Sequence, residues 1–190
     1  GREMRGAKGS GIFVGPADIG RSYDRVSDHY EAYFLQTMHQ YNDQLLEALL
    51  ARLSKTEPMI LDLACGTGNF FGLLPDTMAG SKLHGVEIDP LTGKIAKQLY
   101  QKANIAVQGF EETKLPDDHF DVVIGNVPFG DFKVNDSRYN AQKFLIHDFF
   151  FAKALDKARA GGVVMFITSK GTMDKASPEV RKYIDRKSVV

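Results

Sequence analysis

The sequence predicts an α/β fold with a doubly wound, mainly parallel sheet. Three observations indicate it: five short apolar runs alternate with helical or loop stretches, the 190 residues have the length of one ordinary domain, and 43% of them are hydrophobic. Strands that alternate with helices pair in parallel, because each connection carries the chain back to the same edge of the sheet. We therefore expect a buried core with helices on both faces of the sheet.

Composition excludes several other classes of protein. Lys and Arg together number 24, as do Asp and Glu, so no global basic field indicates nucleic acid. No apolar run approaches the roughly 18–20 residues that a membrane span needs, so we expect no membrane partner. The single cysteine, Cys65, excludes an internal disulfide framework and a cysteine-based zinc cluster, which fits a cytoplasmic protein.

The first part of the chain is expected to be an arm followed by a helical region. Residues 1–20 are rich in glycine and show little apolar periodicity, which predicts a flexible arm. Within residues 21–56, apolar side chains recur at three- and four-residue steps from Tyr30 to Leu53, which is typical of an amphipathic helix. Residues 57–190 then hold the α/β core, so that 21–190 form one domain.

The core is expected to contain five strands. The predicted strands are 59–64, 82–87, 105–108, 120–125 and 162–168, and the predicted helices lie near 70–74, 91–102, 144–158 and 178–186. Ala160-Gly161-Gly162 is expected to end the third helix directly before the fifth strand. The chain ends where a sixth strand could begin, so we expect a sheet truncated after strand five or completed by a partner.

The clearest motif is Asp62-Leu63-Ala64-Cys65-Gly66-Thr67-Gly68-Asn69, in which a Gly-x-Gly turn follows a strand and opens a helix. Gly66 and Gly68 allow backbone angles and close approaches that a β-carbon would prevent. Glu87 ends the second strand 21 residues after Gly66, the spacing at which an acid accepts hydrogen bonds from a ribose diol. A nucleoside is therefore predicted at the carboxyl ends of the first two strands.

Two details distinguish this motif from a dinucleotide-binding site. Phe71 stands where the dinucleotide pattern has its third glycine. Asp62 places a negative charge where it would repel a pyrophosphate and attract an ammonium group, and S-adenosyl-L-methionine has an ammonium group and no phosphate. The Asp-x-x-x-Gly-x-Gly pattern resembles motif I of the class I S-adenosylmethionine-dependent methyltransferases, which have a Rossmann-like fold.

This resemblance implies S-adenosyl-L-methionine as cofactor and S-adenosyl-L-homocysteine as product. The implied cofactor-binding residues are Asp62, Ala64, Gly66, Gly68, Asn69, Glu87, Ile88, Phe110, Glu111, Asn126 and Tyr30, with Tyr23 as a further candidate. Among them, Glu111 would bind the adenine amino group and Phe110 would pack against the base. Either of these two could instead be a solvated loop residue or a core anchor.

The fourth strand runs into Asn126-Val127-Pro128-Phe129, which resembles the (Asn/Asp)-Pro-Pro-(Tyr/Phe) motif of amino methyltransferases. An adenine amine is a poor nucleophile, because its lone pair is delocalised into the ring. The resemblance implies Asn126, Pro128 and Phe129 as catalytic residues: the side-chain carbonyl of Asn126 and the carbonyl of Val127 accept the two hydrogens, and Phe129 stacks on the base. No metal is required. Val127 replaces the first proline, so we expect a less rigid loop.

Residues 66–186 are similar to the adenine-N6 DNA methylase domains of large methylase and helicase proteins of mobile elements. The first 65 residues are more similar to small-molecule methyltransferases, which would make the chain a hybrid. A DNA substrate implies a flipped or single-stranded adenine and sequence specificity supplied by another domain or protein. Two alternatives stay open: a small-molecule or protein-amide methyltransferase, and a cofactor-binding module that is inactive alone.

Overall fold

The computed structural model describes residues 57–128, 130–168 and 178–188, all within a compact unit that spans Ala51–Val190. The expectations for residues 1–20 and 21–56, which include Tyr23 and Tyr30, lie outside the described residues. Phe129 lies outside them as well.

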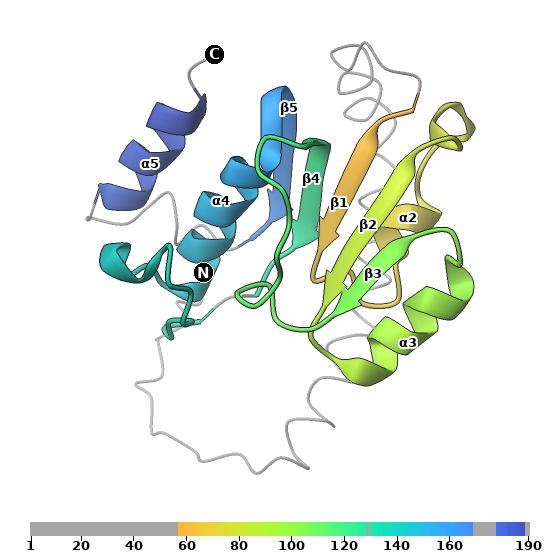
Figure 1. The fold of residues 1–190 in the computed structure, drawn as a ribbon, viewed down its shortest axis with the longest axis horizontal. Helices are drawn as coiled ribbons and strands as arrows, with labels where there is room; N and C mark the ends of the chain where they lie inside the picture. Colours follow the sequence, from red (N-terminus) through yellow and green to blue (C-terminus); the bar gives the residue numbers. More distant parts are fainter. Residues whose placement is uncertain (1–56, 129, 169–177, 189–190) are drawn as a thin grey trace, which may run out of the picture. The chain divides into compact units, whose positions relative to one another are not determined.

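Five strands of the described part of the chain form a parallel sheet (Figure 1). They are β1 (Met59–Leu63), β2 (Lys82–Glu87), β3 (Asn104–Val107), β4 (Phe120–Asn126) and β5 (Ala158–Ile167). Their order is β3-β2-β1-β4-β5, and every neighbouring pair is parallel. The chain moves outward from β1 through β2 to β3 and then starts again at β4, on the other side of β1. The predicted doubly wound parallel sheet is confirmed.

The described helices connect and cover these strands. They are α2 (Asn69–Gly72), α3 (Pro90–Leu99), α4 (Ile146–Lys157) and α5 (Glu179–Ser188), with short 3-10 turns at Asp76–Met78 and Asn140–Gln142. α3 begins after Asp89 because the Asp89 carboxylate accepts a hydrogen bond from the Thr92 N–H at 2.8 Å and Pro90 takes the first helical position. None of the described helices is long and apolar enough to cross a membrane.

Two hydrophobic clusters lie on opposite faces of the sheet. Right-handed crossovers place α2 and α3 on one face and α4 on the other, because β1 to β3 and β4 to β5 advance in opposite directions. Leu61 and Leu63 belong to the cluster that includes α4, whereas Phe71 and Ala96 belong to the cluster of α2 and α3. Asp62 lies between the two leucines in β1, so its side chain points toward the face of α2 and α3.

The fifth strand begins earlier than expected. α4 ends at Lys157 and β5 begins at once with Ala158, so the predicted helix stop at Ala160-Gly161-Gly162 is wrong. The pairing with β4 shifts irregularly there, from Phe120 opposite Ala158 to Val122 opposite Val163. Gly161 supplies a left-handed φ of +70° for this irregularity.

The connection from β3 to β4, residues 108–119, contains no helix. It starts at the carboxyl edge of the sheet and returns to the amino edge, where β4 begins, and it passes beside α4 (Figure 1). Its first turn is closed by the Thr113 hydroxyl, which donates to the Gly109 carbonyl at 2.8 Å. Residues 108–119 form the crossover loop.

Candidate active site

The turn after β1 is built from left-handed residues. Ala64, Gly66 and Gly68 have φ angles of +57°, +54° and +92°. The two glycines adopt such angles freely, whereas an alanine pays about 1–2 kcal/mol for them. The turn is tied to β2, because the Cys65 N–H donates to the Val86 carbonyl at 3.1 Å.

Gly66 and Gly68 differ in the space that a β-carbon would find at each position. A β-carbon on Gly68 would clash with the ring of Tyr100, which packs edge-on against Phe71 with ring centroids 5.3 Å apart. At Gly66, nothing lies within 4 Å of the position that a β-carbon would take. Gly68 therefore serves a contact within the protein, whereas Gly66 leaves open space at the carboxyl edge of the sheet.

The carboxylate of Glu87 is held between two backbone segments. Its Oε2 accepts a hydrogen bond from the Gly66 N–H at 2.7 Å, and its Oε1 accepts one from the Asp89 N–H at 2.8 Å. Each carboxylate oxygen has a second acceptor position, so Glu87 can also accept hydrogen bonds from hydroxyl groups. The next residue, Ile88, is 68% exposed and offers an apolar surface beside them.

Asp62 is a fully buried carboxylate without a hydrogen-bond partner among the described residues. Burial, with a further contribution from the negative charge of Glu87, raises its pKa well above the ordinary value. An uncompensated buried charge is costly, and a cationic ligand group would offset that cost. The open space at Gly66, the held carboxylate of Glu87 and the unpartnered Asp62 together fit an ammonium-bearing nucleoside such as S-adenosyl-L-methionine.

Cys65 lies in the same turn and is buried. Burial and the nearby carboxylates of Asp62 and Glu87 raise the pKa of its thiol to about 12. Because the thiolate is the reactive form, Cys65 is not an activated nucleophile.

Phe110 and Glu111, the two residues predicted to contact the adenine, have different surroundings in the structure. Phe110 is 3% exposed, and its ring packs against Phe149 and Phe150 with centroids 5.8 and 5.1 Å away. It is therefore a core anchor, the alternative that the sequence left open. Glu111 is partly exposed after β3, and its carboxylate folds back over Gly109.

Asn126-Val127-Pro128-Phe129, called the acceptor motif below for its predicted role, starts beside the turn at residues 64–68, which is predicted to bind the cofactor and is called the cofactor turn. In the register between β1 and β4, Leu63 is paired with Gly125, and a β-carbon on Gly125 would clash with the Leu63 carbonyl oxygen. Neighbouring strands lie about 4.8 Å apart. Ala64, the first residue of the turn, and Asn126, the last residue of β4, follow this pair and are therefore neighbours at the carboxyl edge of the sheet. This is also where the direction of the crossovers reverses, the usual place for ligands in open α/β sheets.

The valine that replaces the first proline of the acceptor motif is well anchored. The Val127 N–H donates to the Ile167 carbonyl of β5 at 3.2 Å, and its side chain is 1% exposed. A proline could not make that hydrogen bond. The expectation that Val127 leaves the loop less rigid is therefore not supported, because strand pairing and burial replace the constraint of the ring. Pro128 is partly exposed beyond it, and Asn69 is exposed in the first turn of α2.

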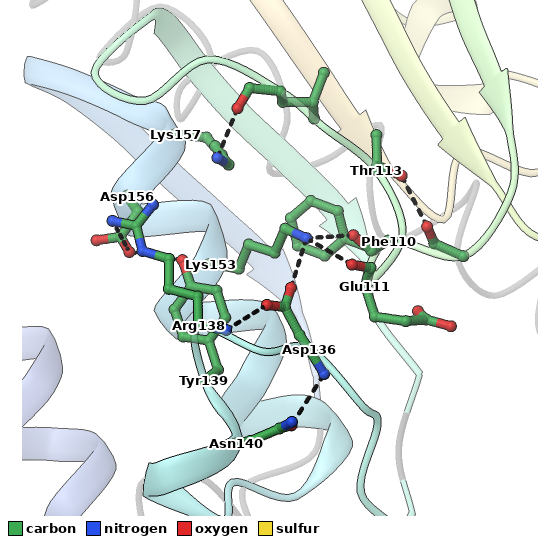
Figure 2. A network of polar contacts seen from close by, with 12 residues as sticks. Phe110, Glu111, Thr113, Asp136, Arg138, Tyr139, Asn140, Lys153, Asp156 and Lys157 are labelled. Atoms are coloured by element: carbon green, nitrogen blue, oxygen red, sulfur yellow. Dashed lines mark hydrogen bonds and ion pairs between the residues drawn. The ribbon is translucent and has the colours of Figure 1, made fainter.

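The sequence did not indicate a network of buried polar contacts on α4 (Figure 2). Lys153 and Lys157 donate to carbonyl and carboxylate groups of other segments, and Asp156 accepts from Tyr139 at 2.6 Å. The one available signal was the presence of four charged residues, Asp148, Lys153, Asp156 and Lys157, within an otherwise apolar segment. His147, which precedes Asp148 on the same helix, is buried as well.

A comparison with solved structures identifies the fold of this domain. The structure resembles that of an S-adenosylmethionine-dependent methyltransferase from Clostridium acetobutylicum ATCC 824, with a TM-score of 0.53 and 18% sequence identity. The match covers 80% of this chain and 61% of that one. The fold is that of the class I methyltransferases, whose cofactor is S-adenosyl-L-methionine, as the sequence predicts.

The sequence itself defines the family. The model of the Eco57I restriction-modification methylase family matches residues 77–189, and the chain belongs to this family. Defense against restriction protein B of Escherichia phage P1 is 32% identical over 111 residues, which cover 56% of this chain and 5% of that protein. Type II methyltransferase M.CvrRI of Paramecium bursaria Chlorella virus XZ-6E is 36% identical over 84 residues, which cover 44% and 22%. The chain thus spans less than a quarter of either relative.

Proposed function

We propose that this domain transfers a methyl group from S-adenosyl-L-methionine to the exocyclic N6 amine of adenine in DNA. Membership of a restriction-modification methylase family and similarity to a viral type II methyltransferase support a DNA substrate. The observation that carries the proposal is the pairing of Leu63 in β1 with Gly125 in β4. Because these two residues are paired, the cofactor turn and the acceptor motif begin next to each other at the carboxyl ends of the two strands.

The cofactor side of the site would be formed by residues from the first three strands. The sulfonium of the cofactor supplies an electrophilic methyl group. Asp62 would bind the ammonium group, Glu87 the ribose hydroxyls and Glu111 the adenine amino group. Ile88 would cover the base with its exposed side chain. Ala64, Gly66, Gly68 and Asn69 would form the wall of the turn.

The acceptor side would be formed by the end of β4. The side-chain carbonyl of Asn126 and the backbone carbonyl of Val127 would each accept one hydrogen of the amine, which favours a pyramidal nitrogen with an available lone pair. Phe129 would stack on the base and Pro128 would hold the loop between them. The hydrogen bond from the Val127 N–H to β5 helps to keep its carbonyl in place.

DNA contacts would come from the segment after the acceptor motif. Lys133 and Lys143 are exposed and line one cavity of about 280 Å³, which suits them to bind backbone phosphates. Arg138, a third cation in this segment, instead pairs with Asp117 at 2.6 Å and Asp156 at 2.9 Å. A target adenine would be flipped out of the duplex or come from a single strand, and sequence specificity would come from another domain or protein.

The direct test is to incubate the protein with DNA and methyl-labelled cofactor and to measure N6-methyladenine by mass spectrometry. We expect label on DNA and a loss of about 100-fold in kcat for Asn126→Ala, because one acceptor for the amine hydrogens is removed. Label on small metabolites or proteins alone would favour a small-molecule or protein-amide methyltransferase. Cofactor binding without turnover on any nucleic acid would favour a binding module.

A further inference from the structure

Lys153 joins two segments that the proposed reaction uses. From α4, its ammonium group donates to the carbonyl oxygens of Phe110 at 2.6 Å and Glu111 at 3.2 Å (Figure 2). It also donates to the carboxylate of Asp136 at 2.8 Å. The first two residues belong to the start of the crossover loop, where the adenine is expected to bind. Asp136 lies ten residues after Asn126, in the segment that follows the acceptor motif.

The ammonium group of Lys153 is buried and donates hydrogen bonds to three acceptors. Lys153 is 4% exposed, and its three N–H bonds face three acceptors. Its Nζ also lies 4.9 Å from the centroid of the Phe110 ring. Burial lowers the pKa of this ammonium, and the carboxylate of Asp136 works against that effect. A buried lysine with this many partners fixes the relative positions of the groups that it contacts.

Lys157 makes a matched set of contacts at the other end of the same loop. It donates to the Leu115 carbonyl at 2.7 Å and to the Asp117 carboxylate at 2.6 Å. α4 runs from the carboxyl edge toward the amino edge, because β5 starts opposite Phe120 at the amino end of β4. Lys153 is therefore about 6 Å nearer to the carboxyl edge than Lys157. The two lysines contact the crossover loop at two different distances from the carboxyl edge of the sheet. Of the two, Lys153 is the one near that edge, where the cofactor is expected to bind.

We propose that Lys153 is a positioning residue, which holds the adenine end of the cofactor site and couples it to the segment that follows the acceptor motif. This inference rests on the proposed function, because it concerns the same site. Lys153 acts through the backbone of Phe110 and Glu111 on one side and through Asp136 on the other. In this role it would contact neither the methyl group nor the amine.

The test compares Lys153→Met with Lys157→Met as a matched control. Methionine keeps the length and flexibility of the side chain and removes the charged donors. Both variants lose contacts of one buried lysine, so we expect both to unfold at a lower temperature than the wild type. The dissociation constant of S-adenosyl-L-homocysteine, measured by calorimetry, should rise about tenfold in Lys153→Met and stay within about twofold in Lys157→Met.

Two further readouts distinguish positioning from a general loss of structure. Methylthioadenosine, which has the adenosine but lacks the amino acid, should lose the same factor of affinity in Lys153→Met. Asp136→Asn keeps the two carbonyl contacts of Lys153 and weakens the link from Lys153 to the acceptor segment. It should leave the affinity for S-adenosyl-L-homocysteine within about twofold and lower kcat on DNA about fivefold.

Each outcome is decisive. Equal affinities for S-adenosyl-L-homocysteine in the wild type and Lys153→Met, or equal losses in Lys153→Met and Lys157→Met, would overturn the inference. If Lys153→Met does not fold, Asp136→Asn with wild-type turnover would overturn it as well. A wild-type protein that does not bind S-adenosyl-L-homocysteine would instead contradict the proposed function.

Discussion

Two buried carboxylates, Asp62 in β1 and Asp156 in α4, differ in whether the protein supplies them with hydrogen-bond partners. Both are almost inaccessible, with exposed fractions of 0% and 1%. Asp156 accepts hydrogen bonds from Tyr139 at 2.6 Å and Tyr183 at 2.9 Å and pairs with Lys187 at 2.7 Å. Asp62 has no hydrogen-bond partner in the described part of the chain.

The pKa values of the two groups differ accordingly. Burial alone would raise the pKa of Asp156, but the contacts from Lys187, Tyr139 and Tyr183 outweigh it and lower the pKa. At Asp62, burial and the charge of Glu87 both raise the pKa. The fold therefore surrounds one buried carboxylate with hydrogen-bond donors and cations, and at the carboxyl edge of the sheet it does not. This difference indicates that Asp156 stabilises the ligand-free protein, whereas Asp62 is suited to stabilise a complex with a cationic ligand.

The largest expected effect is on stability, in Asp156→Ala. Removing this carboxylate takes away the acceptor shared by two tyrosines and two cations, so we expect the free energy of unfolding to fall by about 3 kcal/mol. Urea unfolding followed by circular dichroism measures it. Asp62→Asn is the control, and without ligand it should be at least as stable as the wild type. A loss below about 1 kcal/mol in Asp156→Ala, or a larger loss in Asp62→Asn, would contradict the comparison.

A smaller effect is expected at the two glycines of the cofactor turn. Gly68→Ala should lower the free energy of unfolding by about 2 kcal/mol, since it adds a clash with Tyr100 to an unfavourable φ. Gly66→Ala should cost about 1 kcal/mol, from the backbone angle alone. It should nevertheless weaken the binding of S-adenosyl-L-homocysteine, because its methyl group enters the open space. Urea unfolding and calorimetry on both variants measure these effects, and equal stability losses would count against the assignment of Gly66 to the ligand.

The smallest expected effect is a pH dependence of stability that Asp62 causes. A raised pKa means that the folded protein keeps a proton that the unfolded chain has lost, so stability falls as pH rises from the ordinary value of 3.8 toward the folded pKa. Asp62→Asn lacks this contribution. The stability advantage of the variant over the ligand-free wild type should therefore grow as pH rises above 3.8 and level off above the folded pKa, in urea unfolding at several pH values. A difference that stays constant with pH would show that Asp62 keeps an ordinary pKa.

The sequence was sufficient to predict the sheet and the residues at the carboxyl ends of β1 and β2, because these features depend on local patterns. Apolar runs located all five strands, and the spacing of Asp62, Gly66 and Glu87 predicted two carboxylates and an open glycine at one edge. The start of β5 could not be predicted in the same way. A Gly-Gly pair ends helices and also relieves irregular strands, and only the register with β4 decides between them.

The contacts that escaped prediction are those between segments far apart in the sequence. Lys153, Asp156 and Lys157 have the residue types of a solvent-facing helix surface, but α4 is buried on most sides because the crossover loop passes beside it. Phe110 fits a base-stacking role as well as a core role by sequence, and only its packing against Phe149 and Phe150 identifies the core role.

The central feature of the proposed cofactor site is Asp62 as the partner of an ammonium group, and calorimetry with two ligands tests this role most directly. S-adenosyl-L-homocysteine carries the amino acid and methylthioadenosine does not. We expect Asp62→Asn to weaken the binding of S-adenosyl-L-homocysteine about 30-fold, since a charge-assisted hydrogen bond is lost, and to leave the affinity for methylthioadenosine unchanged. Equal affinity of wild type and variant for S-adenosyl-L-homocysteine, or equal losses for both ligands, would contradict it.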